Sequence, residues 1–338
     1  MKLVIVGAGP VGLVAALYAQ RAGLDVRVLE QRRKLPLDKA CGEGLMPGGV
    51  AVLQDLGVDI PDQGSSEFTG IRWISDEVVA DAPFPHGVGR GIRRTWLHEA
   101  LWERAGELVQ TGVEVHDYVD GGLETSKGRV EADAILGADG LHSRLRQAAG
   151  LDAGPGPVRR YGVRRHYTLE PWSDRVEVWW GEGVEAYVTP VGPERVGVAM
   201  LTGSRARFDE ALAGFPGLVE RLEGAKQESQ DRGAGPLHQR ARKVRDGKLL
   251  LVGDAAGYLD AVTGEGLALG FHQARAAVRA LTGGPSYERA HARLVRLPFF
   301  LMHALLFAQR RPALRHAVVR FLAGRPALFS RLLELNDA

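Results

Sequence analysis

Three short glycine-bearing segments lie far apart in the chain, and each of them directly follows an apolar run. They are Gly7-Ala8-Gly9-Pro10-Val11-Gly12, Gly137-Ala138-Asp139-Gly140 and Gly253-Asp254-Ala255-Ala256-Gly257. Glycine lets a backbone approach a ligand closely, and α/β sheets bind nucleotides where a buried strand joins a loop or helix. The three segments together predict one site for FAD.

The first segment has the setting of a dinucleotide fingerprint. Residues 2–6 form an aliphatic run typical of a strand, and residues 11–22 have the spacing of a helix whose N-terminus can hold a pyrophosphate. Residues 25–29 alternate as a second strand, which ends at Glu30, near the roughly 20-residue offset of a ribose-binding acid. A carboxylate there accepts ribose hydroxyl protons and repels a 2′-phosphate, so the pattern favours FAD or NAD. The next residues are also cofactor candidates, although a solvated basic turn stays open for the arginines: Gln31, Arg32 and Arg33.

Composition and the N-terminus bound the class of protein. The chain has 338 residues, 45% hydrophobic and 25% charged, with a formal net charge of +2, which suits a soluble enzyme and gives nucleic-acid binding no support. Its one cysteine, Cys41, excludes an intramolecular disulfide framework and a multi-cysteine metal site. The apolar N-terminus superficially resembles a signal peptide, but glycines and a proline interrupt it and no clean cleavage site follows. We therefore expect a cytoplasmic protein without a bound metal.

The second and third segments repeat the join of strand and helix. Residues 134–136 and 248–252 are apolar runs typical of buried strands, and helices are predicted from Ser143 and over residues 267–281. The loop before the last of these helices carries two glycines that permit close backbone approach to a ligand: Gly264 and Gly266.

At these motifs the chain resembles a known family, the FAD-dependent group A flavoprotein monooxygenases (the p-hydroxybenzoate hydroxylase-like superfamily), and especially their geranylgeranyl-reductase-like branch. The resemblance covers nearly the whole chain. It is carried by the fingerprint with Glu30, the D-G motif Asp139-Gly140, the G-D motif Gly253-Asp254 and the family arginine, Arg94. It implies an α/β fold with a Rossmann-type, glutathione-reductase-like FAD-binding domain, an inserted antiparallel β-sheet substrate domain and C-terminal helices.

The predicted parts of the chain alternate along the sequence. The FAD-binding domain takes residues 1–60, 90–158 and 240–290, the substrate-binding sheet takes residues 61–89 and 159–239, and residues 291–338 form a helical region. Short aromatic and β-branched runs between Gly/Pro turns predict antiparallel strands in the substrate domain. These runs are residues 68–75, 164–169, 175–180, 186–191 and 195–201.

Two loops favour the reductase-like branch: Cys41-Gly42-Glu43-Gly44-Leu45 and Thr263-Gly264-Glu265-Gly266. The resemblance implies that both loops flank the isoalloxazine ring. For Cys41, a small buried residue is an equally open interpretation, and Glu43 and Glu265 either tune the site or hold loop amides. The expected cofactor-binding residues are Gly7, Gly9, Pro10, Val11, Gly12, Glu30, Gln31, Arg32, Arg33, Cys41, Gly42, Arg94, Asp139, Gly140, Gly253, Asp254, Gly264, Glu265, Gly266 and Leu267.

Catalytic side chains stay unknown from the sequence, with Cys41, His166 and Tyr187 as weak candidates and ordinary sheet packing as the alternative for the last two. Reductases of this branch resemble one another in an aromatic-x-Trp-x-Phe-Pro strand that lines the lipid cavity. The matching stretch here is Glu185-Ala186-Tyr187-Val188-Thr189-Pro190. It predicts a more polar pocket, which counts against prenyl reduction, and it lacks the Trp-x-Trp-x-Ile-Pro of flavin halogenases.

The C-terminal part is predicted to be helical, with its most apolar run at residues 297–308. A run of about a dozen residues is too short to span a bilayer. Arginines then follow without an acid until Glu334, so residues 313–323 suit either a helix on the inner face of the membrane or a capping helix with solvent-facing arginines. The second interpretation is the commoner one, and the oligomeric state stays open.

The leading functional hypothesis is an FAD-dependent monooxygenase that takes hydride from NADH or NADPH and hydroxylates a hydrophobic, electron-rich small molecule of aromatic, polyketide or quinol type. The alternative is a geranylgeranyl-reductase-like enzyme that reduces isoprenoid double bonds. A non-catalytic flavin-binding module at a membrane edge ranks below both. A reductase with two bound dinucleotides would need a second glycine fingerprint, so the nicotinamide cofactor is expected to bind transiently.

Overall fold

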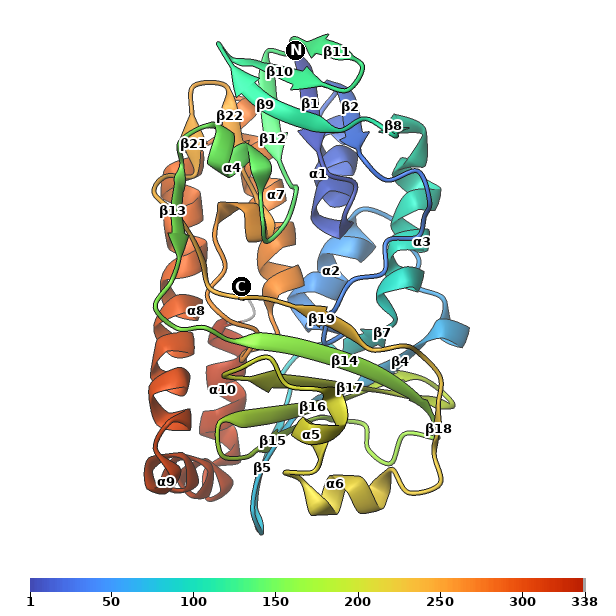
Figure 1. Cartoon of the computed structure of the whole chain (residues 1–338), viewed down its shortest axis with the longest axis vertical. Helices are drawn as coiled ribbons and strands as arrows, with labels where there is room; N and C mark the ends of the chain where they lie inside the picture. The colour runs from blue at the N-terminus through green and yellow to red at the C-terminus, as the bar shows by residue number, and fades with distance from the viewer. Residues whose placement is uncertain (337–338) are drawn as a thin grey trace.

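A computed structural model describes residues 1–336, and Figure 1 shows a long molecule with a parallel sheet in one half and an antiparallel sheet in the other. The first sheet has the strand order β21-β22-β12-β1-β2-β8, and every neighbouring pair is parallel except β21 with β22. Its central strand β1 is an aliphatic run buried on both faces, as is usual in parallel sheets that helices cover. The strands are β1 (Lys2–Val6), β2 (Asp25–Glu30), β8 (Val109–Thr111), β12 (Ala134–Gly137), β21 (Arg245–Asp246) and β22 (Leu249–Leu251).

Helices and small sheets complete this half. Helices α1 (Pro10–Arg21) and α7 (Gly266–Leu281) pack together, with α3 (Arg94–Ala105) against α1 and α2 (Pro47–Asp55) against α7. Helix α4 (Arg144–Ala148) packs on the antiparallel sheet of β9 (Val115–Val119), β10 (Gly122–Thr125) and β11 (Gly128–Val130). Two further small sheets join the halves: β3 (Gly44–Leu45), β7 (Gly89–Ile92) and β4 (Ser65–Phe68), and β13 (Asp152–Pro155) with β20 (Gln239–Ala241).

The eight-stranded sheet of the second half has the order β18-β14-β17-β16-β15-β5-β6, with β19 also paired to β14. All its pairs are antiparallel except β15 with β5. The strands are β5 (Gly70–Ser75), β6 (Val78–Pro83), β14 (Tyr161–Thr168), β15 (Val176–Trp180), β16 (Val184–Gly192), β17 (Arg195–Thr202), β18 (Lys226–Gln227) and β19 (Arg232–Ala234).

Each face of the large sheet has its own helical cover. Helices α5 (Phe208–Leu212) and α6 (Pro216–Arg221) pack on one face. Helices α8 (Tyr287–Gln309), α9 (Pro312–Ala323) and α10 (Pro326–Asn336) pack with the apolar side chains of the other face. Trp179 and Trp180 belong to these two different clusters, as the alternation of a strand requires.

The α/β class, the Rossmann-type half, the inserted antiparallel sheet and the C-terminal helices are confirmed. One strand prediction is wrong: residues 68–75 are not a single strand, because Phe68 ends β4 in a small sheet and β5 begins at Gly70 in the large one. At the start of β5 the backbone packs so closely on β6 that a Cβ at Gly70 would collide with the Ala82 carbonyl oxygen, so this position requires glycine. The three-part division of the chain stays a prediction.

Helix α8 is longer than its apolar run and, by length and composition alone, could cross a bilayer. One such helix is weak evidence of a span, because helices of soluble proteins meet the same test. It is not a core helix either, since only 17% of its most apolar window is buried.

Candidate FAD and substrate site

One cavity of about 1230 Å³ joins the two halves of the molecule. Its wall at one end comes from the carboxyl ends of the parallel strands β1, β2, β12 and β22 and the loops that follow them. At the other end the wall comes from the large sheet and from helices α8 to α10. The carboxyl edge of a parallel sheet is where open α/β folds bind their ligands.

Most of the residues predicted to bind the cofactor lie in this wall. Two do not: Gly12 packs inside the fold, and Arg33 is exposed beside Gly112. The predicted residues that line the cavity are Gly7, Gly9, Pro10, Val11, Glu30, Gln31, Arg32, Cys41, Gly42, Arg94, Asp139, Gly140, Gly253, Asp254, Gly264, Glu265, Gly266 and Leu267.

The turn after β1 has the shape that a pyrophosphate requires. Gly7 has a φ of +103°, and a Cβ on Gly7 or on Gly12 would collide with the backbone of Ala138 or of Gly7. Helix α1 begins with Gly9 as a cap that offers no side chain, so the first-turn N–H groups have no side-chain acceptor there. Glu30 accepts hydrogen bonds from the Ala8 and Arg32 N–H groups at 3.0 and 2.8 Å and so fixes both loops. These residues fit the diphosphate and ribose of a dinucleotide.

Two charged residues, Arg94 and Asp254, line the cavity. The Nε of Arg94 is buried and has no partner among the described residues, which leaves it as a donor for a ligand. Asp254 follows β22, and enclosure away from bulk water raises the pKa of its carboxyl although the charge of Arg94 opposes this. A carboxyl and a guanidinium of this kind fit the hydroxyl groups and phosphates of FAD.

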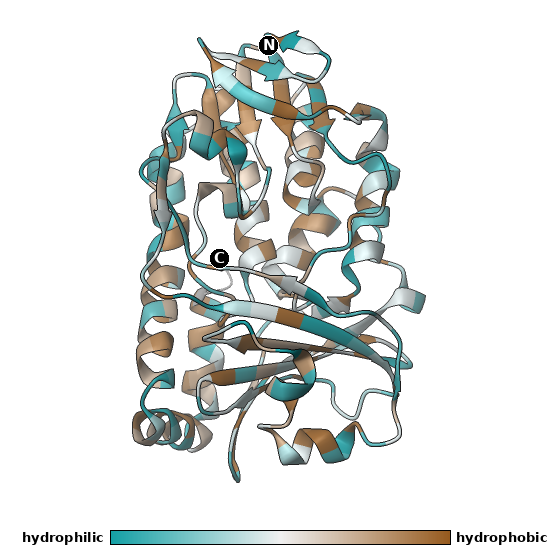
Figure 2. Cartoon of the chain, viewed as in Figure 1, coloured by the Kyte–Doolittle hydropathy of each residue, from teal (hydrophilic) through white to brown (hydrophobic). Residues whose placement is uncertain are grey.

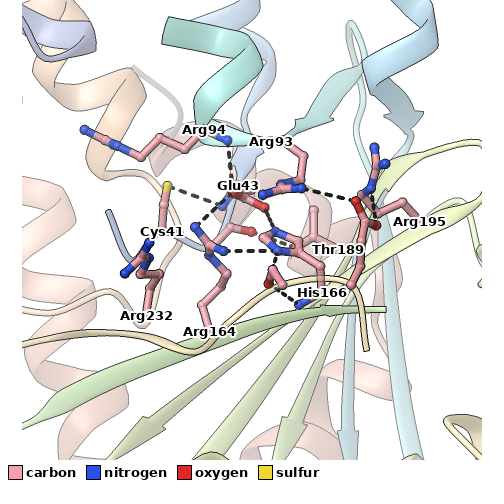
Figure 3. A network of polar contacts seen from close by, with 12 residues as sticks. Cys41, Glu43, Arg93, Arg94, Arg164, His166, Thr189, Arg195 and Arg232 are labelled. Atoms are coloured by element: carbon pink, nitrogen blue, oxygen red, sulfur yellow. Dashed lines mark hydrogen bonds and ion pairs between the residues drawn. The ribbon is translucent and has the colours of Figure 1, made fainter. Parts of the chain in front are cut away.

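The Cys41 loop meets the large sheet through a buried polar network (Figure 3). Oε2 of Glu43 lies 2.5 Å from Nε2 of His166 on β14, and Oε1 of Glu43 accepts the Arg94 N–H at 2.9 Å. Arg164 lies 3.0 Å from Nδ1 of His166 and also pairs with Asp38. Sequence reasoning missed Arg164, because nothing in a lone arginine of a strand indicates that it faces inward.

The three catalytic candidates have different positions. Cys41 lines the cavity, and its enclosure raises the pKa of its thiol. Tyr187 also lines the cavity, and its hydroxyl donates to the Val262 carbonyl at 2.8 Å. His166 is fully buried behind Glu43 and is not among the described lining residues, and burial lowers its pKa.

The expectation of a polar pocket needs a correction. Thr189 and Tyr187 line the cavity, but Glu185 is not among the described lining residues. Glu185 is fully buried and pairs through both oxygens with Arg160, at 3.1 and 2.5 Å, and Arg160 also lies 3.0 Å from Asp260. The acid that replaces an aromatic residue in this strand is therefore neutralised by an ion pair rather than presented to a ligand.

The far end of the cavity is apolar, which the sequence did not predict. Its lining comes from the large sheet and from all three C-terminal helices, at the three- and four-residue spacing of one helix face. That spacing is the signal that was available in the sequence. The residues are Ile71, Trp73, Val176 and Val178 in the sheet, Leu301 and Leu305 in α8, Ala317, Val318, Phe321 and Leu322 in α9, and Phe329, Leu332 and Leu333 in α10.

Relatives of known name resemble this chain over most of its length. A menaquinone reductase of Mycolicibacterium smegmatis is 28% identical over 83% of this chain and 76% of its own. A digeranylgeranylglycerophospholipid reductase of Methanopyrus kandleri is 27% identical over 78% of this chain and 76% of its own. Among solved structures, a flavoprotein/dehydrogenase of Cytophaga hutchinsonii superposes with a TM-score of 0.78 at 20% identity and full coverage of both chains. A probable FAD-dependent monooxygenase of Pseudomonas aeruginosa gives 0.73 at 19% identity, over 99% of both chains.

The sequence profile of the FAD binding domain family matches residues 1–81 and 99–290 of this chain. That match covers most of the chain and includes the glycine turn, Glu30, the D-G motif and the G-D motif. The chain therefore belongs to the FAD binding domain family and is an FAD-dependent oxidoreductase.

Proposed function

We propose that this flavoprotein reduces carbon–carbon double bonds in a long apolar chain of the prenyl type. The observation that carries the proposal is the apolar end of the cavity, which continues from the FAD site to helices α8 to α10. A volume of about 1230 Å³ exceeds the roughly 300–1,000 Å³ of a usual small-molecule site, as a cavity for a dinucleotide and a second, elongated ligand should.

The names of the relatives support the same substrate class. They specify reduction of geranylgeranyl groups and of menaquinone. The argument from Glu185 against prenyl reduction loses its force, because that carboxylate is paired with Arg160 behind the wall.

The side chains of the wall have separate tasks in this proposal. FAD, when bound, supplies hydride transfer. Trp73, Val178 and the helices exclude water along the substrate chain. Reduction of a double bond adds one hydride and one proton, and Cys41 lines the cavity with a raised thiol pKa, so its Sγ holds a proton at neutral pH. The electrons come from NADH or NADPH, which we propose as a transient donor.

A second candidate is hydroxylation of an electron-rich ring, the leading hypothesis from the sequence. The observation that favours it is the polar stretch of the cavity wall around Glu43, Arg164 and Thr189, which suits a hydroxylated head group. Both reactions would use the same cavity. They can be distinguished by their need for oxygen and by their product.

One experiment separates the two. Reduced enzyme is mixed without oxygen with a geranylgeranyl ether lipid and with a prenylated naphthoquinone, and the products are analysed by mass spectrometry. Re-oxidation of the flavin with a product that gains two hydrogen atoms supports reduction. A product that forms only with oxygen and carries an atom from it assigns hydroxylation instead.

A matched pair of variants tests the apolar end. Leu305→Trp fills the cavity wall on α8, whereas Leu297→Trp adds the same ring at a half-exposed position of the same helix outside the wall. We expect Leu305→Trp to lose turnover of long-chain substrates and to keep that of short-chain analogues, and Leu297→Trp to keep both. Equal loss of both substrates in Leu305→Trp would count against a chain in this part of the cavity.

We also propose that the substrate enters from an anionic membrane surface at the inner face of the membrane, through helices α8 to α10. Figure 2 shows much of the ribbon of these helices in the hydrophobic colour. Arg311 stacks on Phe307 and Arg325 on Phe321, with the guanidinium carbon 3.7 and 4.1 Å from the ring centre, a pairing that suits the level of the head groups. The large apolar side chains that these helices expose are Leu297, Phe300, Phe307, Leu314, Phe321, Leu328 and Leu335.

Vesicle pelleting tests this entry. Vesicles with anionic lipid should sediment the protein at low salt, and the double variant Phe300→Ser, Phe307→Ser should reduce the bound fraction. Val219→Ser, which removes an exposed apolar side chain on α6, serves as the control. Equal binding of all three proteins would refute the helices as the contact.

A further inference from the structure

We propose that Glu43 and His166 are positioning residues that latch the Cys41 loop (residues 41–44) to strand β14 of the large sheet. The latch holds the thiol of Cys41 and the start of α3 against the FAD site from the substrate side. The inference rests on the flavin site and does not depend on whether the enzyme reduces or hydroxylates its substrate.

The backbone conformation of Glu43 is one that the surrounding residues must stabilise. Its φ is +59°, a left-handed conformation that favours glycine, and the two neighbours in the sequence are glycines. A glutamate persists in such a conformation where its surroundings over-determine it. Here the Glu43 carbonyl accepts the Ile92 N–H at 2.9 Å, and its own N–H donates to the Cys41 sulfur at 3.4 Å.

Both oxygens of the Glu43 carboxylate have partners, and Oε1 also lies 3.8 Å from the Arg164 guanidinium. Oε1 accepts the N–H of Arg94, the first residue of α3, whose cap Arg93 provides no side-chain hydrogen bond. A carboxylate at this place satisfies a free N–H group and complements the helix dipole. Because the side chain of Arg94 lines the cavity, Glu43 positions a residue that faces the cofactor as well as its own loop.

The donors around His166 determine which nitrogen carries the proton. A guanidinium has donors only, so Nδ1 accepts from Arg164 at 3.0 Å. Ser229 Oγ also lies 2.8 Å from Nδ1. The proton of the neutral ring is therefore on Nε2, from which it is donated to Glu43 at 2.5 Å. Burial and the charges of Arg164 and Arg93 lower the pKa of His166, so the ring stays a neutral, directional donor.

A second tie from the same sheet holds the residue before Glu43. Thr189 on β16 donates to the Gly42 carbonyl at 2.9 Å. Cys41 itself has no side-chain bond of this kind to the sheet; its sulfur contacts the Glu43 N–H. Figure 3 shows the loop between these ties and Arg94. Loss of the latch should therefore appear first as exposure of Cys41.

The experiment measures the rate at which a maleimide labels the apoprotein, and Cys41 is the one cysteine of the chain, so the signal is specific. His166→Leu removes the donor. Glu43→Gln leaves one acceptor oxygen and one amide donor, so the side chain cannot accept from both Nε2 of His166 and the Arg94 N–H. Each variant should raise the labelling rate and the dissociation constant for FAD about tenfold to a hundredfold, the loss expected for a hydrogen bond to a charged group. The double variant should lose less than the sum of the two single variants, because both changes break the same hydrogen bond.

Two controls separate a latch from general destabilisation. His166→Gln places an amide donor near the position of Nε2 and should restore labelling and FAD affinity to within a few-fold of the parent. Arg165→Met breaks two ion pairs, with the more exposed carboxylates of Asp209 and Asp231, on the opposite side of the same strand, and it should leave both readouts unchanged in native conditions. Parent-like labelling of His166→Leu, or equal acceleration in Arg165→Met, would overturn the proposal.

Discussion

The wall of the cavity is built differently in the two halves of the molecule. Where the parallel sheet meets the cavity, the wall includes three glycine-bearing loops: the glycine turn after β1, the D-G loop and the loop after β22. Where the large sheet meets it, ion pairs and the hydrogen bond of the neutral His166 to Glu43 form or support the wall. Arg160 lies between Glu185 and Asp260, Arg164 is paired with Asp38, and His166 with Glu43.

This difference separates two kinds of specificity. A backbone cradle accepts any dinucleotide with the same phosphates, and it fails when a side chain fills it. A wall supported by buried charges has a shape that depends on the partners of each charge, because one unpaired charge in the interior is costly. The cofactor half should therefore be sensitive to added volume, and the substrate half to lost charge and to pH.

Arg160→Met should have the largest effect, because it leaves Glu185 and Asp260 buried without their cation. We expect a loss of about 3–5 kcal/mol in the free energy of unfolding at pH 7. Burial already raises the pKa of both carboxyls, and Arg160 opposes that rise. Carboxyls with a raised pKa in the folded state stabilise it at low pH and lose this contribution as pH rises. Urea titrations should thus find the variant closest to the parent near pH 4 and furthest from it near pH 7.

A charge-neutral double variant is the control for that loss. Arg160→Met with Glu185→Leu leaves one carboxyl, Asp260, in place of two. It should recover part of the stability and flatten the pH dependence. If Arg160→Met were as stable as the parent at every pH, buried ion pairs would not be what stabilises the substrate half.

The parallel-sheet half also contains titratable side chains whose pKa is shifted by burial, and His272 sharpens the comparison. His272 on α7 is buried, and burial together with the charge of Arg275 lowers its pKa from 6.5 to about 4. Below pH 6.5 the unfolded state binds a proton at this histidine more readily than the folded state does. The free energy of unfolding therefore falls as pH decreases from 6.5 towards 4. The loss amounts to about 3 kcal/mol. His272→Leu should show a shallower acid transition in thermal unfolding, and His116→Leu, at an exposed site, should not.

The two halves also differ in how much of them the sequence revealed. The strands and glycine loops of the cofactor half could be predicted, because a tight turn, a helix start and a ribose acid each require a residue type at a fixed spacing. The roles of three charged residues could not be predicted, because they depend on which side chains face each other across strands that are far apart in the chain. These residues are Arg160, Arg164 and Asp260. Glu185 is an example. From the residue type alone we expected a polar pocket, whereas its carboxylate is paired with Arg160 and does not line the cavity.

Gly12→Ala tests the backbone cradle directly. A Cβ at this position would collide with the Gly7 carbonyl and would lie 3.4 Å from the Ala138 Cβ, so α1 must move away from β1. We expect a loss of about 2 kcal/mol in stability and a fall in FAD affinity of at least tenfold. Gly203→Ala, where a Cβ has open space around it, should change neither quantity measurably. Normal FAD binding by Gly12→Ala would contradict a cradle built by the backbone.

Tyr187→Phe and Tyr287→Phe form the finest test, because the same change is made once in each half. Tyr187 donates to the Val262 carbonyl at 2.8 Å and lines the cavity, whereas Tyr287 donates to the Leu251 carbonyl at 2.5 Å and is buried away from it. Each loss of a buried hydrogen bond should cost about 1 kcal/mol in chemical denaturation. Only Tyr187→Phe should also alter the KM for the apolar substrate, since it loosens the loop of Val262 that forms part of the wall. An equal change of KM in both variants would mean that the substrate half responds to stability alone, and that its wall has no specificity of its own.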